Sequence, residues 1–232
     1  MQISIEDFTA EVTLKRIKRM NLRVRPPDGA VSISAPAWMK LEAVRHFALA
    51  NLEWIRRQQQ RLRQLPYQVA LSYVDGETHY VWGQPFTLRV TTRNQPPAVS
   101  LKAGTLTLSV RPRSSRQKRA ALLAAWYREQ TRAAAEPLVR RWEPAVGRRI
   151  SRLYVQQMKT RWGSCNITQR SMRLNSELAK RPAHLLEYVV VHELVHLLEG
   201  SHNQVFKAHM TRLLPRWREY RKELSRRGME PD

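Results

Sequence analysis

Residues 189–206, VVVHELVHLLEGSHNQVF, contain two histidines and a glutamate arranged as in a metal-dependent hydrolytic site. His192 and His196 are four residues apart, so on a helix both imidazoles lie on one face and can reach one ion. Glu193 lies beside the first histidine, where it can take a proton from a water molecule at that ion. Because neutral imidazole nitrogens suit zinc, this HExxH pattern predicts a zinc site.

A third protein ligand is expected from the segment that follows. If the helix stops at Gly200 and the chain reverses, His202 can return to the same ion as His196. Three protein ligands leave the fourth position for water or substrate, which is the open arrangement of a catalytic zinc. Glu199 and His209 are the competing candidates for the third position.

The helix that must carry this pattern has recognisable ends. Pro182 fits a first helical turn and Gly200 fits a C-terminal cap, so residues 183–198 are predicted to form a mostly buried helix. The alternative is a core helix whose histidines are satisfied by hydrogen bonds. That alternative would also have to bury Glu193 among apolar neighbours, and buried carboxylates are rare unless they are paired or bound to metal.

The first third of the chain alternates apolar and polar residues, which predicts strands over residues 12–36 with a Pro-Pro-Asp-Gly turn. Their outward positions are basic, which is typical of a solvated face and also suits a basic binding surface. The period becomes helical over residues 41–65, and two further strands follow in THYVWGQPFTLRV and TLTLSV, with a turn at Gly83 and Pro85. A long helical pattern begins near Ser115 and is expected to break or restart at Pro137.

These elements predict an α+β protein. Residues 1–112 are expected to form a β-rich portion with one helix, and residues 113–232 a helical portion that holds the metal site. No period of 20 to 50 residues repeats.

Composition limits the classes of function. The formal net charge is +22, so nucleic acid and other anions are candidate partners. The one cysteine, Cys165, excludes an internal disulfide framework and fits a reducing compartment. No apolar run reaches the roughly 20 residues that cross a bilayer, and the first twenty residues do not read as a signal segment. We therefore expect a cytoplasmic protein without a membrane span.

Three segments together resemble a known family: MKTRWGSC, then MRLNSELAKRP, then EYVVVHELVHLLEGSHNQVFKAHM. They resemble the YgjP-like metallopeptidases, relatives of the SprT-like and WLM zinc peptidases, and the upstream strands follow in the same order. The resemblance implies a zincin-like fold in which His192, His196 and His202 bind zinc and Glu193 is the general base.

The same resemblance makes residues 172–175 an edge strand near the metal helix, to which an extended peptide could add. Arg161, Ser164 and Asn175 are then candidate substrate-binding residues, the first two as donors to an oxyanion or a phosphate. Trp162, Gly163 and Cys165 are expected to serve structure, as a core side chain, a tight turn and a small buried group.

Three functions remain open. The first is a zinc metallopeptidase acting on a protein or peptide. The second, also implied by the resemblance, is hydrolysis of a nucleoside triphosphate such as UTP by a pyrophosphatase, for which magnesium ligands would be expected. The sequence contains neither a carboxylate cluster nor a GxxxxGKS/T loop to support that activity. The third is a basic, DNA-associated protein with a secondary metal site.

Overall fold

The computed structural model describes residues 1–25, 29–64 and 71–225. The chain divides into two compact units, Met1–Ala70 and Leu71–Asp232. The expected division at residues 112/113 therefore differs from the structural one, because strands assigned to the N-terminal portion belong to the second unit. Among the described residues, no helix combines the length and apolar composition needed to cross a bilayer.

The first unit is a four-stranded sheet followed by two helices. Its strands are β1 (Gln2–Ile5), β2 (Phe8–Lys15), β3 (Asn21–Arg25) and β4 (Ala30–Pro36), in the order β1-β2-β4-β3. The predicted alternation is confirmed, since Val12 and Ile33 are buried while their neighbours along each strand are more exposed. Val44, Ala48 and Ile55 of the helices belong to the same apolar core. The predicted Pro-Pro-Asp-Gly turn includes residues 26–28, which lie outside the described residues.

The single helix expected over residues 41–65 is divided in two, α1 (Leu41–Ala50) and α2 (Leu52–Gln64). Asn51 separates them and caps the first, with its backbone N–H directed at the carbonyls of Ala48 and Leu49. Its side-chain amide also donates to the carbonyl of Phe47, at 2.8 Å. Asparagine competes for helical carbonyls in this way, which explains a break that apolar periodicity does not reveal.

The second unit begins with another four-stranded sheet. Its strands are β5 (Thr78–Val81), β6 (Gln84–Thr92), β7 (Ala98–Lys102) and β8 (Thr105–Val110), in the order β5-β6-β8-β7. Both sheets share one topology: the first two strands are antiparallel, the second and fourth parallel, and the third and fourth antiparallel. The chain thus contains the same strand arrangement twice, each time followed by a helix.

The helix after the second sheet is α3 (Arg116–Val146), which is 31 residues long. It begins where predicted, since the Ser115 hydroxyl accepts a hydrogen bond from the backbone N–H of Lys118. It ends at Gly147, whose φ of 73° is the left-handed value that glycine adopts most readily. The expected break at Pro137 is wrong: the helix runs through it, because a proline removes only one internal hydrogen bond and the packed helix tolerates that loss.

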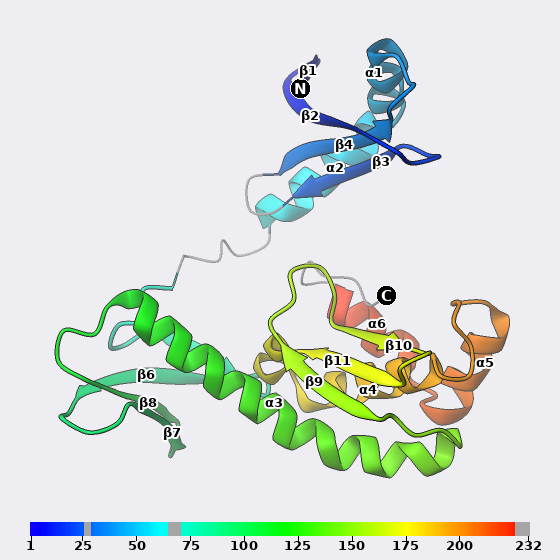
Figure 1. Ribbon diagram of the computed structural model, residues 1–232. Coiled ribbons are helices and arrows are strands. Elements are labelled where there is room, and N and C mark those ends of the chain that lie inside the picture. Colours follow the sequence, from blue (N-terminus) through cyan, green and yellow to red (C-terminus); the bar gives the residue numbers. More distant parts are fainter. Residues whose placement is uncertain (26–28, 65–70, 226–232) are drawn as a thin grey trace. The chain divides into compact units, whose positions relative to one another are not determined.

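A three-stranded sheet follows, made of β9 (Arg152–Gln156), β10 (Gly163–Asn166) and β11 (Ser171–Asn175) in the order β10-β11-β9. The prediction that residues 172–175 form an edge strand is therefore wrong, because β11 pairs with both neighbours and lies in the centre. The edge strands are β9 and β10. In Figure 1, α3 is the long green helix that extends from the β5–β8 sheet to this second sheet.

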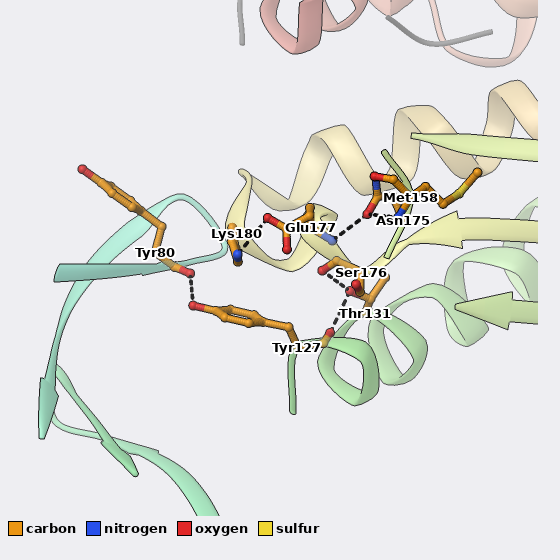
Figure 2. A network of polar contacts seen from close by, with 8 residues as sticks. All are labelled: Tyr80, Tyr127, Thr131, Met158, Asn175, Ser176, Glu177 and Lys180. Carbon is orange, nitrogen blue, oxygen red and sulfur yellow. Dashed lines mark hydrogen bonds and ion pairs between the residues drawn. The ribbon is translucent and has the colours of Figure 1, made fainter. Parts of the chain in front are cut away.

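A polar network joins these parts of the second unit (Figure 2). The Tyr127 hydroxyl on α3 donates to the carbonyl of Tyr80 on β5, at 2.9 Å. One turn further along α3, the buried Thr131 hydroxyl lies 3.1 Å from the carbonyl of Ser176, in the 3₁₀ helix η1 (Ser176–Lys180). Helix α3 is thus hydrogen-bonded to the β5–β8 sheet and to η1, the segment that directly follows β11.

Candidate metal centre

The helix with the histidines is α4 (Ala183–Val195), and most of its surface is apolar and buried. Such a helix is stable only when it is enclosed, and α3, α5 (Gln204–Leu213), α6 (Trp217–Ser225), β10 and β11 all contact it. Within this core, the exposed fraction is 3% for His192, 1% for Glu193 and 8% for His196. The polar side chains of the HExxH pattern therefore lie in the apolar centre of the second unit.

The helix ends earlier than the sequence predicts. His196 is the C-terminal cap, still with helical φ and ψ, and residue 200 is not the cap. The loop that follows is held by Glu199, whose carboxylate accepts hydrogen bonds from the backbone and hydroxyl of Ser201 at 3.0 and 2.9 Å. These bonds also lower the pKa of Glu199. This carboxylate therefore orders the loop that leads to His202.

Three imidazoles meet at one point. The Nε2 atom of His192 lies 3.3 Å from Nε2 of His196 and 3.0 Å from Nε2 of His202. Among the described residues, these three form the one cluster of at least three His, Cys, Asp or Glu side chains that could hold a metal ion, with all candidate ligand atoms within 4.8 Å of one another. Glu199 and His209, the competing third ligands, are not part of it. His192 comes from α4, His196 from its C-terminal cap and His202 from the loop before α5.

The orientation of His196 is fixed by a second contact. Its Nδ1 lies 3.1 Å from the backbone carbonyl of Glu199. Since a carbonyl only accepts, Nδ1 carries the proton and Nε2 presents a lone pair to the cluster. An imidazole that donates its other N–H to a carbonyl is the usual arrangement around bound metals.

An aromatic side chain supports all three rings. Phe206, on the first turn of α5, has its ring centroid 4.7 to 4.9 Å from each imidazole centroid. Its position follows from the start of α5, where the Asn203 side chain accepts a hydrogen bond from the backbone N–H of Phe206, at 3.1 Å. We did not predict this role from the sequence, although an asparagine directly before a helical pattern is a recognisable N-cap signal.

Gly163 of β10 lies against Glu193 of α4. A Cβ atom at residue 163 would lie closest to Oε1 of Glu193, and it would also come within 2.8 Å of Cγ and 2.9 Å of Cδ. These distances are too short for any side chain larger than hydrogen. The tight turn expected at Gly163 is therefore not its role: the residue is a strand position that leaves room for the buried carboxylate.

We expect Gly163→Ala to displace the Glu193 carboxylate without removing an imidazole. Hydrolytic kcat should fall by about 100-fold, since a misplacement of about 1 Å costs that much, while the metal content stays unchanged. Steady-state kinetics and metal analysis on the same preparation measure both quantities. The matched control is Gly200→Ala, whose added Cβ would meet Ile167 Cδ1 at 3.2 Å and could be accommodated. Wild-type kcat in Gly163→Ala would contradict this account.

The three candidate substrate-binding residues have different surroundings. Arg161 is exposed on the loop before β10. Ser164 is half-buried on β10, and alternation along the strand directs its side chain to the face opposite Gly163. Asn175 has an exposed fraction of 0%, and its amide donates to the carbonyls of Met158 and Arg161 at 3.0 and 2.8 Å (Figure 2 shows the contact with Met158). Asn175 therefore holds the loop that leads into β10.

Cys165 lies on β10, two positions after Gly163. Burial and the charge of Glu193 raise the pKa of its thiol to about 11, so it is protonated at neutral pH. Trp162 is fully buried, as expected of a core side chain. Trp162 thus has the structural role expected of it, whereas Cys165 is half-buried and not the fully buried group that was expected.

A buried helix with two imidazoles, a third imidazole on the next loop and a carboxylate beside them is the arrangement of a metal-dependent hydrolase. Around this centre the chain is a mixed α+β protein with strands in its N-terminal part and helices in its C-terminal part. The chain belongs to the YgjP-like family: the family's "YgjP-like, metallopeptidase domain" matches residues 18–227. The resemblance inferred from the three sequence segments is thereby confirmed.

Comparison with curated proteins finds no match. Among solved structures, the chain is similar to the crystal structure of the metallopeptidase zymogen of Pyrococcus abyssi abylysin, with 15% sequence identity and a TM-score of 0.39. The similarity covers 42% of this chain and 99% of that one.

Proposed function

We propose that this protein is a zincin-like zinc metallopeptidase, with His192, His196 and His202 as the metal ligands and Glu193 as the general base. The observation that carries the proposal is the convergence of the three Nε2 atoms beside a buried carboxylate. Family membership supports the same class of reaction.

The donor set fits zinc. With Zn–N bonds of about 2.0–2.1 Å and tetrahedral angles, two ligand nitrogens lie about 3.4 Å apart. The separations from His192 Nε2, 3.3 and 3.0 Å, are close to that value. Three imidazoles form a borderline-soft set that suits zinc better than magnesium, which prefers oxygen ligands.

A zinc ion bound there would polarise the scissile carbonyl and make water a stronger nucleophile. Glu193, held beside Gly163, accepts a proton as the water oxygen attacks the carbonyl carbon. The same carboxylate then delivers that proton to the leaving amine nitrogen as the C–N bond breaks. His196 keeps its orientation throughout because its Nδ1–H remains bonded to the Glu199 carbonyl.

The peptide substrate would bind along β10, the edge strand that contains Gly163. An edge strand offers unpaired backbone N–H and C=O groups, so an extended peptide can add to the sheet with little sequence preference. On the opposite side, β10 is already paired with β11. Because β11 is paired on both sides, we propose that the substrate pairs with residues 163–166 and not with residues 172–175.

The test combines metal analysis with two substrates. We expect the purified protein to contain about one zinc ion per chain and to release peptides from unfolded casein. Peptide release should stop when a chelator removes zinc and return when zinc is restored. Release of pyrophosphate from UTP with magnesium, with casein left intact, would instead establish a nucleotide pyrophosphatase. A protein that binds no metal would contradict both hydrolase assignments.

A further inference from the structure

Helices α5 and α6 border a basic groove on the surface of the second unit. A depression of about 540 Å³ lies between them and is lined by Lys207, Arg218, Arg221 and Lys222. A second depression, of about 480 Å³, shares Lys207 and Arg218 with the first and extends along α5 to Arg212. The two depressions adjoin, and we call the shallow surface that they form the α5–α6 groove; five cationic side chains line it.

These five cations have no carboxylate partner among the described residues, whereas the carboxylates of α6 are already engaged. Glu219 pairs with Arg216 at 2.8 Å, and Glu223 lies 2.8 Å from His184. Helix α5 has no acidic residue. Among the residues that the structure describes, the positive charge of the groove is therefore not neutralised by the carboxylates of its own helices.

We propose that the α5–α6 groove binds the phosphate backbone of double-stranded nucleic acid. Three of its five cations are arginines, whose planar guanidinium groups match phosphate oxygens in a bidentate way. The formal charge of +22 for the chain adds long-range attraction to an extended polyanion. This proposal does not depend on the peptidase assignment, because the metal ligands are not part of the groove.

The groove favours a duplex over a single strand. Binding of single strands usually needs exposed aromatic rings on which bases stack. The one aromatic residue that lines the groove, Trp217, is 4% exposed, and the Arg218 guanidinium lies 4.6 Å from its ring centroid. A cationic surface without exposed aromatic rings can contact phosphates but makes no base-specific contacts. Binding should therefore be independent of the DNA sequence.

Fluorescence anisotropy with a labelled random-sequence DNA duplex, measured on the full chain over a range of NaCl concentrations, tests the proposal. With up to five phosphate contacts, the slope of log affinity against log salt should approach about −4.5. The triple variant Arg218→Gln, Arg221→Gln, Lys222→Gln should make that slope shallower by about 2.7. At about 100 mM salt its affinity should fall by at least about tenfold.

The matched control removes the same charges from the β5–β8 sheet, with Arg89→Gln, Arg93→Gln and Lys102→Gln. These three side chains are exposed, so the control fold should be retained. The proposal requires that the control keep the wild-type slope. Equal loss in both triple variants would overturn it in favour of diffuse charge attraction.

Three further measurements complete the test: competition by poly-glutamate, binding of single-stranded DNA, and binding of the duplex by the wild type at low salt. Poly-glutamate that displaces the duplex at equal charge concentration would reassign the groove to acidic polypeptides. Tighter binding of single-stranded than of duplex DNA would overturn the choice of duplex. Failure of the wild type to bind the duplex at about 50 mM salt would refute nucleic-acid binding altogether. Circular dichroism of each variant verifies folding.

Discussion

Replacing Glu193 by glutamine is expected to lower kcat for peptide hydrolysis by about 10²- to 10⁴-fold, the range that general-base catalysis contributes. Glutamine has nearly the volume of glutamate, so it fits the space beside Gly163. It cannot accept the proton of the attacking water. KM should change little, because in the proposed mechanism Glu193 acts on the water and does not bind the peptide.

Metal analysis separates this outcome from unfolding or loss of zinc. The Glu193→Gln protein should retain the wild-type zinc content, since the three imidazoles are unchanged. A matched control is Glu187→Gln on the same helix, at a half-buried surface position where the carboxylate pairs with Arg141 and Trp142. Full activity in Glu193→Gln would show that another group removes the proton.

Replacing His196 by alanine is expected to weaken zinc binding by more than about 100-fold, because even an outer-shell partner of a metal ligand contributes 10- to 100-fold. Two changes coincide in this variant. It loses the Nε2 atom that lies 3.3 Å from His192 Nε2, and it loses the hydrogen bond from Nδ1 to the Glu199 carbonyl. Competition with a chromophoric chelator of known affinity measures the change.

His209→Ala is the control for the loss of an imidazole. His209 lies on α5 but outside the cluster, so its removal should leave the zinc affinity at the wild-type value. If both variants lose zinc equally, the third ligand has been misassigned. If neither loses it, the cluster is not a zinc site.

The sequence predicted individual helices and turns better than it predicted which strands pair and which distant residues come into contact. The α4 helix, the start of α3 at Ser115 and the turn at Gly83 are each signalled by local periodicity or by a capping residue, and the structure confirms them. The convergence of His202 with His192 and His196 could also be anticipated, because the three residues are close along the chain. Local patterns determine such features.

Features that depend on contacts between residues far apart in the sequence could not be predicted from local patterns. Gly163 and Glu193 are on different elements, so nothing near either residue signals that one must leave room for the other. Whether β11 lies at an edge depends on its parallel pairing with β9, which apolar alternation does not encode. The burial of Asn175 follows from the same central position.

The duplicated strand topology was also missed. Ile5↔Phe8 and Val81↔Gln84 are equivalent closing pairs of the two first hairpins, yet their residues differ in type. They are separated along the chain by more than the 20 to 50 residues over which repeats are usually sought. When the same strand order occurs twice with different side chains, the repetition can be recognised only from the structure.

The length of α3 has a consequence for how the protein melts. Its first half supplies Leu123 and Tyr127 to the apolar cluster of the β5–β8 sheet, and its second half supplies Ala135 and Val139 to the cluster around α4. Neither cluster can lose its order without exposing part of the same helix. The second unit should therefore unfold in one cooperative transition, and heat that disrupts the β5–β8 sheet should disperse the histidine cluster at the same temperature.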